Sequence, residues 1–124
     1  MNNKKLGTSF EHTVCKLFAD EGFWVHFFSP DIRGTQPFDV IAVKDGFATA
    51  IECKTLADTE NFFRISRLEV NQLMAFEKWL ACGNIEPQIA VLWKGQIYLI
   101  GYNELKEKSK IDMRKLVKNE SDCE

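Results

Sequence analysis

Residues 37–54 read Pro37-Phe-Asp-Val-Ile-Ala-Val-Lys-Asp-Gly-Phe-Ala-Thr-Ala-Ile-Glu-Cys-Lys54, two apolar runs separated by Asp45-Gly46. Asp-Gly between apolar runs strongly indicates a two-residue hairpin turn, because a type I′ turn needs positive φ at both central positions. Such a turn also sets the pairing of the two strands. The sequence therefore predicts a β-hairpin in which Lys44 pairs with Phe47.

This register brings two carboxylates together. Counting outward from the turn places Asp39 directly opposite Glu52, and alternation puts Lys54 on the same face. That face also carries Ile41, Val43, Ala48 and Ala50, whereas the other face carries Phe38, Val40, Ala42, Phe47, Thr49, Ile51 and Cys53. Because both faces are largely apolar, we expect a strand pair that is covered on both sides.

Two like charges directly opposite each other destabilise a strand pair, so a positive group is expected between them. A divalent metal ion would serve, since Mg²⁺ prefers oxygen ligands and needs only one or two protein carboxylates beside waters and phosphate oxygens. Lys54 would point at the same spot. The alternative is that Lys54 forms only a salt bridge with Glu52 at the end of the sheet, which leaves Asp39 unexplained.

The composition fits one domain over residues 1–124, with polar ends at about 1–6 and 118–124 that are expected to fray. No apolar run approaches the roughly 18 residues of a membrane span, so a cytoplasmic location is expected. The four cysteines have no CxxC spacing, and His12 and His26 no metal-ligand spacing, so a zinc site or disulfide framework is not indicated. A net charge of −2 argues mildly against nucleic-acid binding.

Apolar periodicity predicts a mixed α/β fold in the order α-β-β-β-α-β-β-α, with one sheet flanked by helices. Thr8 and Glu11 match a capping box for the first helix, and Ser66 and Glu69 match one for the second. Outside the hairpin, the expected elements are a helix at 8–21, a strand at 23–28, a polar loop at 55–65, a helix from 66 to about 82, strands at 88–93 and 96–102, and a helix at about 104–117 capped by Asn103.

The combination of Phe38-Asp39 with Glu52-Cys53-Lys54, after a first helix bearing Phe10-Glu11, resembles the PD-(D/E)xK nuclease superfamily. Within it, the chain most resembles Holliday junction resolvases of the archaeal and RecU-like type, over about residues 7–105. The resemblance implies a restriction-endonuclease-like core. The chain has Phe38 where the motif has Pro, and a literal Pro30-Asp31 occurs earlier. Nothing fixes Asp31 opposite Glu52, however, so the hairpin register favours Asp39.

The resemblance implies that Asp39, Glu52 and the backbone carbonyl of Cys53 hold Mg²⁺, for which Mn²⁺ should substitute. Lys54 would position the attacking water and offset charge on the phosphate. Glu11 would join the metal directly or through water, although a capping role alone would also explain it.

Gln72 would orient the site, unless it is merely an exposed helix residue. Arg33, Arg64 and Arg67 would bind DNA phosphates. Surface salt bridges with Glu60 or Glu69 are the alternative for Arg64 and Arg67.

The function implied is a metal-dependent endonuclease that hydrolyses DNA phosphodiester bonds, a branched-DNA or Holliday junction resolvase of recombination and repair that acts as a homodimer. A nuclease of the same fold with another DNA substrate, restriction- or replication-linked, fits the motif equally. A non-catalytic nucleic-acid-binding protein is a further alternative, against which the intact Asp39, Glu52 and Lys54 argue. The aromatic strand at 23–28 is a candidate dimer surface, and alternate residues in it are candidates for the core.

Overall fold

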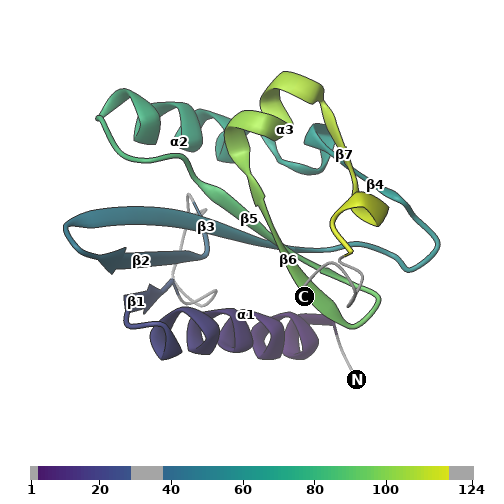
Figure 1. Cartoon of the computed structure of the whole chain (residues 1–124), viewed down its shortest axis with the longest axis horizontal. Helices are drawn as coiled ribbons and strands as arrows, with labels where there is room; N and C mark the ends of the chain where they lie inside the picture. The colour runs from purple at the N-terminus through teal and green to yellow at the C-terminus, as the bar shows by residue number, and fades with distance from the viewer. Residues whose placement is uncertain (1–2, 29–37, 118–124) are drawn as a thin grey trace, which may run out of the picture.

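The computed structural model describes residues 3–28 and 38–117. A five-stranded sheet in the order β1-β2-β3-β5-β6 forms its centre, and a two-stranded sheet of β4 and β7 lies beside it (Figure 1). In the central sheet β3 and β5 run parallel, and the other neighbouring strands are antiparallel. The elements are α1 (Asn3–Asp20), β1 (Trp24–Phe27), β2 (Val40–Lys44), β3 (Phe47–Thr55), β4 (Phe62–Arg64), η1 (Ile65–Arg67), α2 (Val70–Ala81), β5 (Gln88–Trp93), β6 (Gln96–Gly101), α3 (Tyr102–Lys108), β7 (Lys110–Asp112) and η2 (Met113–Lys115).

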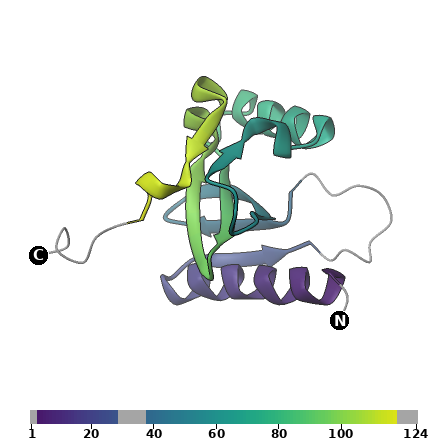
Figure 2. The same ribbon diagram turned by 90° about the vertical axis from the view of Figure 1, so that its right-hand side faces the viewer.

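Helices cover both faces of the central sheet, as the apolar hairpin predicts. In Figures 1 and 2, α1 lies below the sheet and α2 and α3 lie above it. Phe10 and Val14 of α1 pack on Val40, Ile51 and Ala90. The opposite face forms a larger cluster with α2 and α3. The mixed α/β fold with a central sheet flanked by helices is therefore confirmed.

The hairpin register is the predicted one. Lys44 pairs with Phe47, and the ladder continues to the pair of Val40 and Ile51. Asp45 has φ of 55° and Gly46 φ of 83°, as a type I′ turn requires. The turn thus fixes which residues of β2 and β3 meet.

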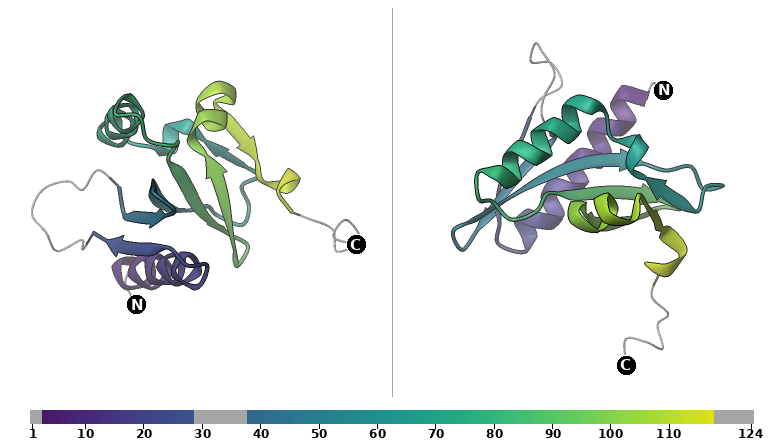
Figure 3. Two further views of the ribbon diagram at one scale, coloured as in Figure 1. Left: turned by 60° about the vertical axis from the view of Figure 1, so that its left-hand side comes forward. Right: turned by 90° about the horizontal axis from the view of Figure 1, so that it is seen from above.

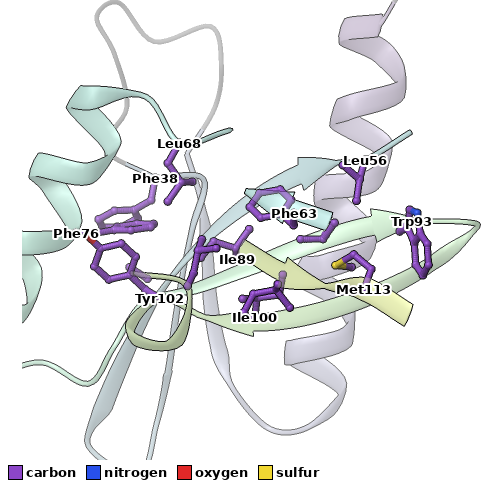
Figure 4. Packing of buried hydrophobic residues seen from close by; sticks show 14 residues of the cluster. Phe38, Leu56, Phe63, Leu68, Phe76, Ile89, Trp93, Ile100, Tyr102 and Met113 are labelled. Carbon is purple, nitrogen blue, oxygen red and sulfur yellow. The ribbon is translucent and has the colours of Figure 1, made fainter. Parts of the chain in front are cut away.

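The regular ladder ends one residue short of Asp39. Ile51 pairs with Val40, and its carbonyl also accepts the N–H of Asp39 at 3.1 Å. Two residues opposite one reverse the alternation of side chains, as in a β-bulge. Phe38, predicted on the face of Val40, therefore packs in the cluster with Ala50 on the opposite face (Figure 4), and that prediction is wrong. The predicted pairing of Asp39 directly opposite Glu52 is wrong for the same reason, because Asp39 and Val40 both lie opposite Ile51.

Both predicted capping boxes are wrong. α1 begins at Asn3, so Thr8 and Glu11 lie inside the helix rather than at its start. α2 begins at Val70 after Glu69, and Ser66 belongs to η1. The Ser-x-x-Glu pattern fails there because the chain makes one turn of 3₁₀ helix before α2 starts. The capping explanation for Glu11 is thereby removed.

The C-terminal segment also differs from the prediction of one long helix. α3 ends at Lys108, because Ser109 adopts φ of 69°, and the chain continues as β7. Ile111 and Met113 are buried at the two-residue spacing of a strand. The partner strand β4 lies within the predicted polar loop. Its three residues are too few to show the alternating pattern from which a strand is predicted. The predicted element order therefore lacks β4 and β7.

Candidate active site

The predicted carboxylates lie where β2 and β3 part beyond the hairpin ladder. Glu52 is on β3, between β2 and β5, and only 4% of its surface is exposed. The helices α2 and α1 lie on opposite sides of the sheet that contains β3 (Figure 3). A carboxylate here has lost most of its water, so its partners must come from the protein or from a ligand.

The two oxygens of Glu52 have different surroundings. Oε2 accepts a hydrogen bond from Nε2 of Gln72 at 2.6 Å and lies 3.7 Å from Nζ of Lys54. Oε1 has no hydrogen-bond partner. Among the described residues, it is the one buried side-chain nitrogen or oxygen atom that lacks such a partner. Leaving a buried acceptor unsatisfied costs about 1–3 kcal/mol. Oε1 is thus a free ligand position.

Gln72 is buried and orients Glu52, which excludes the alternative of an exposed helix residue. Its Oε1 accepts the N–H of Glu69 at the start of α2 at 2.9 Å. A side-chain amide has its acceptor and its donors on opposite sides, so this bond turns the NH₂ group toward Glu52. The helix terminus therefore determines which end of Gln72 meets the carboxylate.

Asp39 is held by the backbone of β3. Its Oδ2 accepts the N–H of Cys53 at 2.8 Å. In the hairpin register Cys53 would pair with Phe38, so the carboxylate takes the place of a main-chain acceptor. Burial raises the pKa of Asp39, and the Cys53 N–H and the charge of Lys54 counteract part of that rise.

Glu11 reaches the same place from α1 and lies close enough to Asp39 for the two groups to affect each other's pKa. Burial, followed by the negative charge of Asp39, raises the pKa of Glu11 to about 7. Burial and Asp39 likewise raise the pKa of Glu52 to about 8, against the opposing charge of Lys54. The structure therefore brings together Glu11, Asp39, Glu52, Lys54 and Gln72, all of the predicted catalytic side chains.

The site fits a hard cation that takes its remaining ligands from water or substrate. In the part of the chain that the structure describes, no three His, Cys, Asp or Glu side chains form a group that could hold a metal ion. Asp39 and Glu52 still offer carboxylate oxygens, and Oε1 of Glu52 is unpartnered. Mg²⁺ usually takes one or two carboxylates and keeps several waters, so this donor set suits it.

The predicted phosphate-binding arginines lie beyond Lys54. Arg67 donates to the carbonyl of Thr55 at 2.7 Å, and Arg64 lies over the ring of Phe62. Within residues 3–28 and 38–117, neither arginine forms the alternative salt bridge with Glu60 or Glu69. Arg33 and Asp31 lie outside the described residues.

Sequence reasoning missed Lys110 because it assigned residue 110 to a solvated helix. In the structure Lys110 pairs across β4 and β7 with Arg64, and both side chains lie against Phe62. Two cations directly opposite each other repel, and an anion between them would relieve that repulsion. A surface groove of about 420 Å³, lined by Thr55, Arg64 and Arg67 among others, lies on the same side.

Comparisons with known proteins agree on one family. The model of the family described as archaeal Holliday junction resolvase (Hjc) matches residues 2–121. The structure resembles that of Hjc, a Holliday junction resolvase from the hyperthermophile Archaeoglobus fulgidus, at 19% identity and a TM-score of 0.63, over 87% of this chain and 88% of that one. No curated protein matches. No helix among the described residues is long and apolar enough to cross a membrane.

The raised pKa values predict that the metal-free protein loses stability as pH rises. Glu52 binds a proton in the folded state up to about pH 8, whereas its ordinary pKa is 4.5. Between these values the folded state holds more protons than the unfolded state, so stability falls with rising pH. Glu52→Gln should flatten this dependence and raise the urea midpoint at pH 8 in EDTA.

The matched control for that experiment is Glu60→Gln, which changes an exposed carboxylate on the loop before β4. It should leave the pH dependence of the urea midpoint as in the unmodified protein. An equally steep fall in stability for Glu52→Gln would contradict the assignment of the shift to Glu52.

Gln72→Glu tests the orientation of the amide. A glutamate can still accept the Glu69 N–H, but it presents an acceptor to Glu52 where Gln72 presents a donor. Two buried carboxylates in contact must share a proton, so thermal unfolding should be nearly normal at pH 5 and clearly lowered at pH 9. An equal loss at both pH values would indicate a packing defect instead.

Proposed function

The chain belongs to the archaeal Holliday junction resolvase family and is thereby a junction-resolving nuclease, and we propose that it cuts branched DNA by metal-dependent hydrolysis at Asp39, Glu52 and Lys54. The observation that carries this proposal is the unpartnered, buried Oε1 of Glu52 beside Asp39. A buried carboxylate with a purely structural role normally has a hydrogen-bond partner for each oxygen. A free oxygen is what a metal ligand requires.

We propose Mg²⁺, with Mn²⁺ as a substitute, held by Asp39, Glu52 and the backbone carbonyl of Cys53. When bound, such an ion supplies a water of lowered pKa and polarises the scissile phosphate. Lys54 is 17% exposed at its side chain and lies at the rim of the site. Its ammonium is a compact charge with three donors, so it can orient the water and offset charge on the phosphate.

Gln72 and Glu11 have supporting roles in this proposal. Gln72 fixes Glu52 so that Oε2 is engaged and Oε1 remains free. Glu11 lies beside Asp39, so we propose that it joins the metal directly or through water, next to Asp39. Loss of the Glu11 charge should therefore weaken metal binding less than loss of Asp39.

DNA phosphates would be bound on the side of β4 and β7. Arg64 and Arg67 lie just beyond Lys54, and Lys110 adds a cation opposite Arg64. We include Arg33, from sequence alone, in the same role. Phosphate contacts of this kind give affinity without sequence preference, which suits recognition of a branched shape. The net charge of −2 is compatible with this, because a few cations gathered at β4 and β7 can bind phosphates whatever the total charge is.

Resolution of a four-way junction needs two symmetric cuts. We therefore propose a homodimer related by a two-fold axis, with one site for each of the two cut strands. For an enzyme that acts on recombining or repaired DNA, we place its work in the cytoplasm.

The principal test is cleavage of a four-way junction, a matched linear duplex and a single strand, with Mg²⁺, Mn²⁺ or EDTA. We expect metal-dependent cutting of the junction. Asp39→Asn should lower the rate by more than roughly 100-fold while preserving junction binding, because it removes the charge and keeps the shape. Asp20→Asn, an exposed position on α1, should cut normally.

Two results would contradict the proposal at different levels. Binding without cleavage of any substrate, in any metal, would make the protein a non-catalytic binder. Equal cutting of linear and branched DNA would favour the alternative of a nuclease with another DNA substrate.

The phosphate assignment predicts a change in salt dependence. In the Asp39→Asn background, Lys110→Ala should weaken junction binding and reduce the slope of log K against log salt by about 1. Because Lys110 opposes Arg64, the same change should leave stability unaltered or raise it by about 0.2–1 kcal/mol. Lys16→Ala, an exposed lysine on α1, is the control and should change neither quantity.

A further inference from the structure

β1 presents a row of aromatic rings on the face of the sheet away from α1. Val25 and Phe27 pack into the cluster under α1, and alternation puts Trp24, His26 and Phe28 on the other side. Phe28 joins the cluster of that side, whereas Trp24 is 63% exposed and His26 is exposed. Val25, Phe27 and Phe28 thus pack against the core, whereas Trp24 and His26 do not.

The rings of this row are ordered with respect to one another. Trp24 and His26 are nearly parallel, at 10°, with centroids 6.2 Å apart. His26 contacts Phe28 edge to face at 4.8 Å. The row therefore consists of two nearly parallel rings, Trp24 and His26, followed by the partly buried ring of Phe28.

The row leads to the catalytic carboxylate. The N–H of Phe28 donates to the carbonyl of Asp39 at 2.9 Å, so the last ring of the row is anchored on the residue that we propose as a metal ligand. Phe28 also contacts Phe38 edge to face. A molecule that covers Trp24 and His26 therefore lies along the strand whose end is bonded to Asp39.

We propose that Trp24 and His26 form a stacking platform for unpaired nucleobases next to the cut, and this inference rests on the proposed function. Alternate residues of a strand are about 6.6 Å apart, roughly twice the 3.4 Å rise of a stacked base, so the spacing suits nucleotides drawn out of the helix. Stacking of a base on an aromatic side chain contributes about 1–3 kcal/mol and tolerates any sequence. A branch point is where strands leave the duplex.

A second copy of the chain would be expected to use β1 differently. β1 is an edge strand whose described partner is β2, and another strand would pair with its free backbone groups in the plane of the sheet. Trp24 and His26 project out of that plane, on the face opposite α1. Their position therefore favours a nucleobase as the occupant.

The test uses the fluorescence of Trp24 in the Asp39→Asn background. Of the three tryptophans, Trp93 is 2% exposed and Trp79 is partly buried, so a stacked base should quench mainly Trp24. A four-way junction with 2-aminopurine at the branch point and an oligothymidine single strand are the ligands. We expect both to quench the tryptophan signal, and Trp24→Phe to remove the quenching.

Affinity separates stacking from packing. Trp24→Ala should weaken junction and single-strand binding by roughly 5- to 150-fold, the range that 1–3 kcal/mol implies, while duplex binding is unchanged. Trp24→Phe should retain most of the affinity, because a phenyl ring still stacks. Phe47→Ala, at an aromatic position 60% exposed on the hairpin, is the matched control and should bind normally.

Three outcomes would overturn the platform. One is wild-type affinity of Trp24→Ala for junction and single strand, and another is an equal loss for duplex. The third is a smaller mass for Trp24→Ala than for the unmodified protein in sedimentation velocity without DNA, which would assign the surface to a second copy of the chain. If oligothymidine quenches Trp24 but no junction is bound or cut, the platform stands and the proposed function fails. If Trp24→Ala cleaves the junction normally, the platform fails and the proposed function stands.

Discussion

The burial of Glu52 in the centre of the sheet is the constraint around which the rest of the site is built. A carboxylate that is 4% exposed is stable only with partners, and the chain supplies two of them. Gln72 comes from the first turn of α2, and Lys54 lies one pleat further along β3. Both contact Oε2 and leave Oε1 free, whereas Asp39, at the bulge before β2, adds a like charge.

The bulge at Asp39 serves this arrangement. A regular ladder would pair the backbone of Cys53 with Phe38, but the extra residue sends Phe38 into the core and lets the Asp39 carboxylate take the Cys53 N–H. The same backbone segment thereby packs the core and places a ligand oxygen. Local rules for strands are broken at this point, and such departures are expected where a protein has a function to perform.

Burial disfavours the ionisation of Glu11, Asp39 and Glu52 and raises all three pKa values, and the charge of Asp39 raises those of Glu11 and Glu52 further. A bound cation reverses that preference, because its charge stabilises the carboxylates that repel one another without it. The same clustering of carboxylates therefore lowers the stability of the metal-free protein and favours the binding of a metal ion. On the substrate side, cations near β4 and β7 suit phosphates, and the rings of β1 suit bases.

The amino-acid sequence by itself determined the hairpin register up to the pair of Val40 and Ile51, the position of Glu52 and Lys54 on one face, and the coverage of both faces. These follow from turn geometry and two-residue alternation, which act over short distances along the chain. The tertiary structure alone decided what depends on contacts between distant segments. Gln72 meets Glu52 across 20 positions of sequence, and Lys110 faces Arg64 because β7 pairs with β4. For Glu11 the sequence left a capping role and a place at the site open, and the structure decided between them, because the start of α1 and its position over the sheet are set by packing.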